Sequence, residues 1–412
     1  MDKTASQKLR RVVSTPMLAM YGIGNIVGAG VYVLIGKIAE PAGYLSIVAF
    51  LLAALVAFCA ALSYAELAAR FPVSAGVSVY LHEAFKAVRL STVMGLLLVL
   101  AGAVSTATLL KGFTGYFHVL FESIPIPVIT IITALVLTAV TLKGIKESVG
   151  LAALLTVVEV GGLLFLVGSI LLAQPDAIAT FHNHFTDALG NIDSAALAGV
   201  LSATLIAFYA FIGFEDMVNI AEEVKEPRKA FPRAILIAIA LVTVLYIAVT
   251  VVTLGVLSPS LLGESKAPLA DAYHAATGNA VGVIVVISLL ATLNGILVNI
   301  IMGSRYLYGL GKRQWISPWF SKVSGRHVPA RGILIMTTIA LIGALWFPIE
   351  HLAQLTSVLL LAVFFAVNTS LIVIRKRPVT TPPVRISPTF VPWVGAVAAG
   401  SLLISQVALL LS

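Results

Sequence analysis

Apolar stretches long enough to cross a lipid bilayer follow one another along almost the whole of this 412-residue chain. A helix needs roughly 20 mostly apolar residues to cross a hydrocarbon core of about 30 Å. Hydrophobic residues make up 59% and charged residues only 11% of the sequence, a composition outside the range of soluble domains. We therefore expect an all-α polytopic membrane protein, with about eleven membrane-spanning helices at residues 16–36, 45–69, 91–118, 127–143, 149–173, 195–221, 232–257, 279–311, 331–347, 352–374 and 390–411.

The positively charged residues predict how these helices are oriented. Cytosolic loops of membrane proteins carry an excess of Lys and Arg. With the amino terminus in the cytosol, only Lys37, Lys111 and Lys266 of the 26 Lys and Arg residues fall on the opposite side. We expect a multi-pass protein of the plasma (inner) membrane, with a cytosolic amino terminus and an external carboxyl terminus. The net charge of +8 then reflects loops that meet anionic lipid, so it does not indicate nucleic-acid binding.

Two of the predicted helices contain short segments that disfavour a continuous helix. The first segment is Gly22–Gly30, with four glycines, and the second is Phe211–Asp216. Membranes tolerate non-helical backbone only where protein or a water-filled cavity covers it, because an unpaired amide or carbonyl in hydrocarbon costs several kcal/mol. Paired broken helices are typical of transporter binding sites. The alternative for the first segment is close helix packing, because Gly24-x-x-x-Gly28 is also a small-residue interface pattern.

The two interruptions lie five spans apart, in helices 1 and 6. A unit with an odd number of spans forces the next copy to point the opposite way across the membrane, so five plus five spans predict an inverted repeat. The first repeat is expected at residues 16–173 and the second at 195–374. Residues 1–15 are then a cytosolic segment, and helix 11 at 390–411 is peripheral.

The residues around both interruptions resemble those of a known transporter family. The segments that carry the resemblance are Asn25-Ile-Val-Gly-Ala-Gly-Val-Tyr32, Phe208-Tyr-Ala-Phe-Ile-Gly-Phe-Glu215, Ala221-Glu-Glu-Val-Lys-Glu-Pro227 and Phe231-Pro-Arg-Ala-Ile235. In this order and these spans they resemble the amino acid-polyamine-organocation (APC) permeases, in particular bacterial-type amino acid transporters. The resemblance implies a LeuT-like fold and alternating access, in which a bundle of helices 1, 2, 6 and 7 rocks against the remaining helices.

Backbone groups at the two interruptions suit the two ends of an amino acid. Amides of Gly28, Ala29 and Gly30 at the start of a half-helix favour a carboxylate, while carbonyls at the end of a half-helix near Tyr209–Ile212 favour an ammonium group. The resemblance places the carboxylate at Ala29 and Gly30 and the amine near the carbonyls of Ile26, Tyr209 and Ile212. Tyr209 or Phe211 could close over the ligand as an aromatic gate, or simply pack in the core. The candidate substrate-binding residues are Ile26, Val27, Gly28, Ala29, Gly30, Tyr209, Phe211, Ile212 and Gly213.

The middle of helix 3 bears on the side chain of the substrate. Residues 96–104 contain no acid. By resemblance, some cationic amino acid permeases carry a Glu at the position of Ala101. A neutral amino acid is therefore favoured over arginine, lysine or a polyamine, although Glu215 and Asp216 could compensate and leave a cationic amino acid or polyamine permease or exchanger as the alternative.

Acidic residues inside the membrane indicate how transport is coupled to an ion. A charge at a helix centre costs at least about 2.5 to 3.5 kcal/mol and tends to mark function. Glu159 lies in helix 5, where resembling permeases can carry a Lys in place of a sodium ion, and Glu215 follows the second interruption. Because burial favours a neutral carboxyl, we expect a proton-coupled secondary transporter in which Glu159 loads and releases the proton, with Glu215 as a second candidate coupling residue. Structural hydrogen bonds of Glu159 and Glu215, ion-free exchange, and a sodium site with Asn294, Asn299 or Ser304 remain alternatives.

Other classes of protein find less support in the sequence. An enzyme is not expected, because no HExxH or GxSxG motif occurs. His182 and His184 fall in an expected solvated external loop at 174–194, and their spacing alone is weak evidence for a metal site. We expect no cofactor besides the coupling ion, an amino acid and membrane lipid as partners, and a monomer or homodimer. A transport-inactive amino acid sensor would keep the same site.

Overall fold

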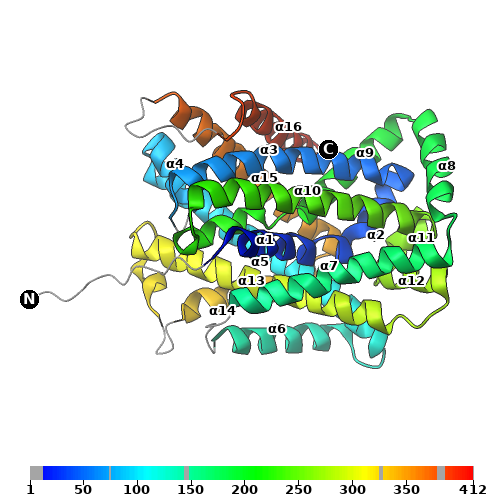
Figure 1. Ribbon diagram of the computed structural model, residues 1–412. Coiled ribbons are helices and arrows are strands. Elements are labelled where there is room, and N and C mark those ends of the chain that lie inside the picture. The colour runs from blue at the N-terminus through cyan, green and yellow to red at the C-terminus, as the bar shows by residue number, and fades with distance from the viewer. Residues whose placement is uncertain (1–12, 74–75, 143–147, 324–327, 378–385, 412) are drawn as a thin grey trace, which may run out of the picture.

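The structure is a computed structural model that describes residues 13–73, 76–142, 148–323, 328–377 and 386–411. Within these ranges the chain is folded into helices and contains no strand, apart from an isolated bridge between Val13 and Val224. Most of the long helices run in roughly the same direction across the molecule (Figure 1).

Each of the eleven predicted spans has a helical counterpart. The counterparts are α1 (Thr15–Ala29) with α2 (Val31–Ala42), α3 (Ser46–Arg70), α5 (Val88–Leu120), α6 (Ile126–Leu142), α7 (Ser148–Ala173), α9 (Ser194–Ala210) with the 3-10 helix η2 (Phe214–Glu223), α10 (Pro227–Leu254), α13 (Gly282–Lys312), α14 (Ala330–Trp346), α15 (Ile349–Arg375) and α16 (Val391–Leu411). Helices 1 and 6 are each divided, as predicted.

Length and composition agree with a polytopic membrane protein. In the described part of the chain, seven helical segments are long and apolar enough to cross a membrane, and α6, α14 and α16 are shorter apolar helices. The predicted all-α fold class is therefore confirmed. That the two halves form an inverted repeat stays a prediction.

The structure also contains elements that the hydropathy pattern did not predict. They are η1 (Gly43–Leu45), α4 (Gly76–Phe85), α8 (Ala177–Gly190), α11 (Pro259–Glu264), α12 (Pro268–Thr277) and η3 (Pro318–Ser321). These segments are too short or too polar to span a membrane, so a search for membrane-length apolar runs passes over them.

The expectation that residues 174–194 form a loop is wrong, because helix α8 occupies most of this segment. Ala177, Phe181 and Phe185 recur every four residues and form one apolar face, on which Ala177 and Phe181 are buried. His184 stacks on Tyr44, with 4.5 Å between the ring centroids. Among the described residues, no group of three or more His, Cys, Asp or Glu side chains could hold a metal ion.

Small side chains allow the central helices to approach one another closely. Ala49, Ala53, Ala57 and Ala60 of α3 recur every three or four residues and are at most 1% exposed. α3 packs against α9 and α10. In lipid, where apolar surface alone does not drive helices together, such close van der Waals packing holds them.

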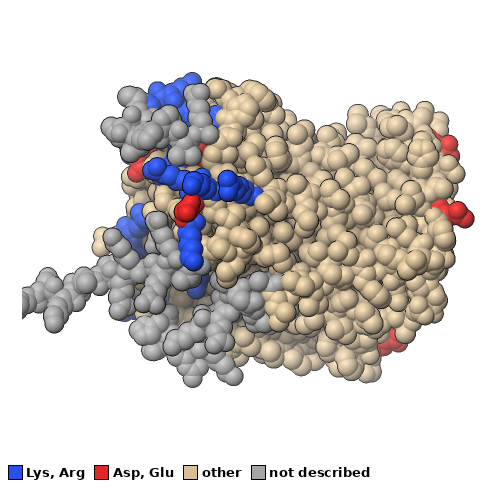
Figure 2. All heavy atoms as spheres, in the orientation of Figure 1, with Lys and Arg blue, Asp and Glu red and all other residues tan. Residues whose placement is uncertain are grey.

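Charged residues are distributed unequally between the two ends of the molecule. On the face shown in Figure 2, the visible Lys and Arg gather at the left end, where Figure 1 labels α4, and only Asp and Glu are visible at the opposite end. The arrangement agrees with the uneven split of Lys and Arg in the sequence. Which end faces the cytosol stays a prediction.

A buried ion cluster joins three segments at the end of the molecule that carries the cations. The carboxylate of Glu66 in α3 accepts hydrogen bonds from Arg70 Nη2 at 2.7 Å, Arg375 Nε of α15 at 2.9 Å and the backbone amide of Ile386 at 3.0 Å. Nη2 of Arg375 donates to the same carboxylate. The side chains of Glu66, Arg70 and Arg375 are 0%, 9% and 6% exposed. The cluster therefore fixes α3 to α15 and to the segment before α16.

Replacing Glu66 with Gln should destabilise the fold strongly. The change leaves two buried guanidinium groups without their counter-charge, which typically costs about 3 to 5 kcal/mol. We expect a loss of this size in the free energy of unfolding of the purified protein in detergent. The matched control is Glu83→Gln, because the Glu83–Lys86 ion pair is exposed and such pairs contribute about 1 kcal/mol or less. Equal losses in the two variants would contradict the role of Glu66.

Candidate substrate site

The first interruption is a single residue long. α1 continues through Ala29, Gly30 has φ −108° and ψ −83°, and α2 begins at Val31. The amide of Gly30 donates to the carbonyl of Val27 at 3.4 Å, and the first bond of α2 runs from Leu34 N–H to Gly30 O at 3.0 Å. The expectation that the amides of Gly28, Ala29 and Gly30 begin the second half-helix is therefore wrong, because these residues end the first one. The amides at the start of α2 belong to Val31 and the residues that follow it.

The second interruption lies where the sequence predicts it. α9 ends at Ala210, and the amides of Phe211 and Ile212 donate to the carbonyls of Phe208 and Tyr209, each at 3.0 Å. Gly213 has φ +129°, a conformation that L side chains rarely adopt. η2 then continues the chain as a 3-10 helix. The carbonyl of Tyr209, expected to be free for an amine, accepts a hydrogen bond from within the turn.

The two interruptions contact each other directly. A Cβ atom on Gly30 would lie 2.6 Å from the Cα atom of Ala210. Asn25 of α1 donates from Nδ2 to the carbonyl of Gly213 at 2.8 Å and to Asp216 Oδ2 at 3.1 Å. The amide of Gly213 donates to Glu215 Oε2 at 2.9 Å. Asn25 was not among the candidate residues, although a polar side chain within an apolar helix is a sequence signal that could have identified it.

Tyr246 of α10 connects the carbonyl groups of the two interruptions. Its hydroxyl lies 3.0 Å from the carbonyl oxygen of Ile26 and 2.9 Å from that of Ala210. Because a phenol has one O–H, the two carbonyls share this donor. Of the three carbonyls that the resemblance assigned to the amine of a ligand, Tyr246 contacts that of Ile26, and its second partner, Ala210, was not among them. Sequence reasoning missed this residue, because a tyrosine in a membrane span carries no signal that distinguishes such a role from packing.

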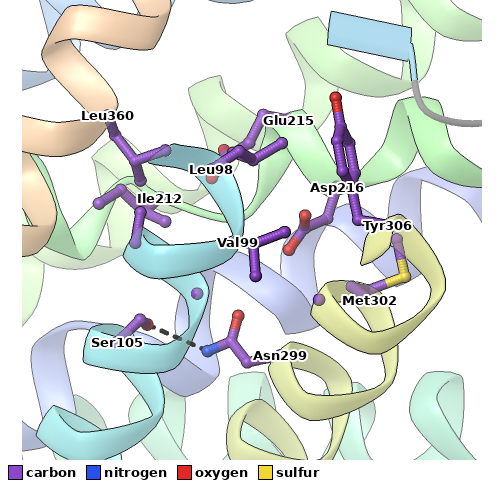
Figure 3. A pocket seen from close by; sticks show the side chains of 13 residues that line it. Leu98, Val99, Ser105, Ile212, Glu215, Asp216, Asn299, Met302, Tyr306 and Leu360 are labelled. Carbon is purple, nitrogen blue, oxygen red and sulfur yellow. Dashed lines mark hydrogen bonds between the residues drawn. The ribbon is translucent and has the colours of Figure 1, made fainter. Parts of the chain in front are cut away.

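A cavity opens beside the second interruption, bounded by α5, η2, α13 and α15. It offers only about 30 Å³ of space to a water-sized sphere, so the cavity is narrow in this conformation. The residues that line it are Leu98, Val99, Ala101, Gly102, Ser105, Ile212, Glu215, Asp216, Asn299, Met302, Gly303, Tyr306 and Leu360. Figure 3 shows Asp216 and Asn299 pointing into the space between α5 and α13. Ala101, the residue considered above for the choice between neutral and cationic substrates, also lines the cavity.

Several predicted residues lie behind the cavity rather than in its wall. Ile26, Val27, Tyr209 and Phe211 are 0% exposed, and of the predicted substrate residues only Ile212 lines the cavity. The Tyr209 hydroxyl forms a hydrogen bond with Ser105 Oγ at 2.9 Å, and Asn299 Nδ2 donates to the same Ser105 Oγ at 3.0 Å. The site thus includes Ser105, which was not predicted, and Asn299, which was considered only for sodium. The aromatic gate stays a prediction.

Glu159 lies in α7, which packs against α1. Its side chain is fully buried, and Oε1 accepts a hydrogen bond from Asn294 Nδ2 of α13 at 3.1 Å. Oε2 has no hydrogen-bond partner among the described residues. The hydroxyl of Tyr32 in α2 donates to the backbone carbonyl of Glu159 at 2.6 Å. Glu159 is therefore connected to the helix that follows the first interruption, although it does not line the cavity.

Comparison with known proteins gives matches along nearly the whole chain. A family model described as "Amino acid permease" matches residues 18–412. The branched-chain amino acid permease BcaP of Bacillus subtilis is 26% identical over 398 residues, which cover 91% of this chain and 83% of that protein. The human cationic amino acid transporter 4 is 30% identical over 406 residues, 93% of this chain and 62% of that protein. The methylthioribose transporter of Bacillus subtilis is 26% identical over 421 residues, 97% of this chain and 88% of that protein.

Gly213→Ala should disturb the second interruption. At φ +129° a Cβ atom is strained, and it would lie 2.8 Å from the backbone of Asn25. We expect a loss of about 1 to 3 kcal/mol in the free energy of unfolding, measured in detergent. The matched control is Gly161→Ala in α7, where no atom lies within 4 Å of the added Cβ and alanine is the better helix former. A neutral result for Gly213→Ala would show that the turn does not depend on glycine.

Proposed function

The chain belongs to the amino acid permease family of membrane transporters, and from this premise we propose that it is a secondary active transporter of a neutral α-amino acid that works by alternating access, coupled to protons. Family membership makes it a transporter and not an enzyme. It also makes an amino acid in general the expected class of substrate. The substrate type, the coupling and the residues involved are the proposal.

The contact made by Tyr246 carries the proposal for the amino end of the substrate. Its hydroxyl donates between two carbonyls, of Ile26 and Ala210, that come from the two interrupted helices. An ammonium group has three donors and can bind both carbonyls at once. The amides at the start of α2 lie beside the same break, where the helix dipole favours a carboxylate. In the ligand-bound state we expect the amine to replace the tyrosine hydroxyl.

The cavity supports a neutral, apolar side chain. Leu98, Val99, Met302 and Leu360 supply most of the bulky apolar lining, and no Lys or Arg lines the cavity. The branched-chain permease among the relatives agrees with this preference. Asp216 supports the second candidate, a cationic amino acid, because its carboxylate lines the cavity and accepts only an uncharged donor, Asn25. The cationic transporters among the relatives agree with that alternative.

The structure suggests which way this conformation is open. Lys37 of α2 and Glu350 of α15 form an ion pair at 2.8 Å, on the side that the charge distribution predicts to be external. The cavity lies beyond the second interruption, next to Glu215 and Asp216, on the predicted cytosolic side. We propose a conformation closed to the outside and opening to the cytosol, in the plasma membrane.

Glu159 supports the proposal of proton coupling. An ionised carboxylate with one neutral donor and no counter-ion is unfavourable in a buried position, so the site suits a carboxyl that takes up and releases a proton. Sodium is the alternative coupling ion. Two of the groups considered for it, Asn299 and Ser304, donate to Ser105 Oγ and to the carbonyl of Ile301, and both keep oxygen lone pairs that could bind a cation. Asn294 donates to Glu159 itself.

Tyr246→Phe tests the proposed position of the amine. The variant keeps the ring and removes the hydroxyl that competes with a ligand for the two carbonyls, so neutral amino acids should bind up to about tenfold more tightly, a gain of about 1.4 kcal/mol. The affinities of the purified protein for leucine and for arginine are measured by calorimetry or thermal shift, and the affinity for leucine should be the higher. The control is Tyr116→Phe, whose hydroxyl bonds the carbonyl of Tyr32. Weaker leucine binding in Tyr246→Phe alone would contradict displacement.

Glu159→Gln tests the coupling. Gln keeps the acceptor for Asn294 and cannot release a proton, so accumulation of substrate driven by an imposed pH gradient should be lost while exchange of labelled for unlabelled substrate continues. The measurement is uptake into liposomes with the reconstituted protein, in sodium-free buffer. Glu122→Gln, an exposed acid after α5, is the control. Undiminished proton-driven accumulation in Glu159→Gln would reject the proposal.

A further inference from the structure

A second cavity lies between the end of α3 and the start of α10, and is named here the α3–α10 cavity. It offers about 460 Å³ of space to a water-sized sphere and is open to solvent. It is lined by Ala69, Arg70, Pro72, Glu226, Pro227, Arg228 and Lys229. Three cations therefore meet one carboxylate, and none of these residues lines the candidate substrate cavity.

Arg70 is the buried part of this cavity. Its side chain is only 9% exposed, and its Nη2 donates to Glu66. Its Nε–H is buried without a hydrogen-bond partner among the described residues. A buried charged donor without an acceptor is unfavourable. Because this Nε–H is sealed from solvent and the guanidinium is paired with Glu66, Arg70 lines the cavity as a fixed, partly balanced charge, and the freer cations of the wall are Arg228 and Lys229.

The start of α10 adds a second attraction for an anion. α10 runs from Pro227 to Leu254, and its N-cap residue Glu226 makes no side-chain capping bond. The positive end of this long helix therefore meets the cavity. Lys229 and Glu226 form an ion pair at 3.2 Å, but their side chains are 72% and 74% exposed. Such an exposed pair is weak, so Lys229 is available to another anion.

We propose that the α3–α10 cavity binds a phosphate-bearing anion. Guanidinium groups match phosphate oxygens in geometry, and a lysine adds a mobile charge. The cavity lies where two membrane-spanning helices end, at the molecule's basic end (Figure 2), so the phosphate can come from an anionic phospholipid headgroup or from solution. The bound anion bridges α3 and α10 and holds the corresponding ends of helices 2 and 7 together.

The test compares the wild-type protein with the double variant Arg228→Gln, Lys229→Gln, which leaves Arg70 and its bond to Glu66 in place. In one arm, inorganic phosphate is titrated into protein in uncharged detergent. In the other, the protein is placed in nanodiscs of phosphatidylcholine with or without phosphatidylglycerol. The readout is the midpoint of thermal unfolding, which rises when a ligand binds the folded state.

A saturable rise with inorganic phosphate, needing about tenfold more phosphate in the double variant, identifies a free anion. A rise with phosphatidylglycerol alone, lost in the double variant, identifies a lipid headgroup. The control double variant Lys312→Gln, Lys322→Gln removes two exposed cations outside the cavity and should respond like the wild type. If the cavity variant unfolds, the single variant Lys229→Gln replaces it in both arms. This variant should need several-fold more phosphate than the wild type for the same rise in the unfolding midpoint. Wild-type behaviour of the cavity variant in both arms overturns the proposal.

Discussion

Backbone amides and carbonyls inside a membrane need hydrogen-bond partners. The rest of this structure depends on which groups supply those hydrogen bonds where two helices break. Tyr246 donates between the carbonyls of Ile26 and Ala210, Asn25 donates to the carbonyl of Gly213, and Glu215 accepts from the amide of Gly213. Each of these groups satisfies backbone that an unbroken helix would satisfy itself. Because Asn25 and Tyr246 reach across from other helices, they also fix the two breaks to each other.

The sequence predicted the membrane-spanning helices well, because hydropathy is summed over about 20 residues and a single polar or misplaced residue changes the sum little. It placed the second break correctly, at Gly213. The first break falls at Gly30 rather than across residues 28–30, because the four glycines all weaken the helix and the local sequence does not choose among them, while Gly30 is the one that lies against Ala210. That contact joins residues far apart in the chain. The role of the Tyr246 hydroxyl was missed for the same reason, whereas α8 was missed because it is shorter than a membrane span.

Two fully buried glutamates show how differently one residue type is used here. Glu66 accepts hydrogen bonds from two guanidinium groups and a backbone amide, so its charge is balanced and it joins three segments. Glu159 accepts one bond from an uncharged amide, and its second oxygen has no partner among the residues described. The burial of the two side chains alone does not distinguish Glu66 from Glu159. The donors around each carboxyl separate a group suited to holding the fold from one suited to changing its protonation state.

The contact between the breaks also bears on how binding becomes movement in the proposed mechanism. A Cβ on Gly30 would lie 2.6 Å from Cα of Ala210, so no space for a ligand exists between the two helices as they stand. An amino acid that takes the carbonyls from Tyr246 must push α1 and α2 away from α9. Since the tyrosine satisfies those carbonyls when no ligand is bound, the empty and occupied states exchange comparable hydrogen bonds. This exchange of partners lowers the cost of passing between the empty and the occupied conformation, and alternating access requires that both be populated.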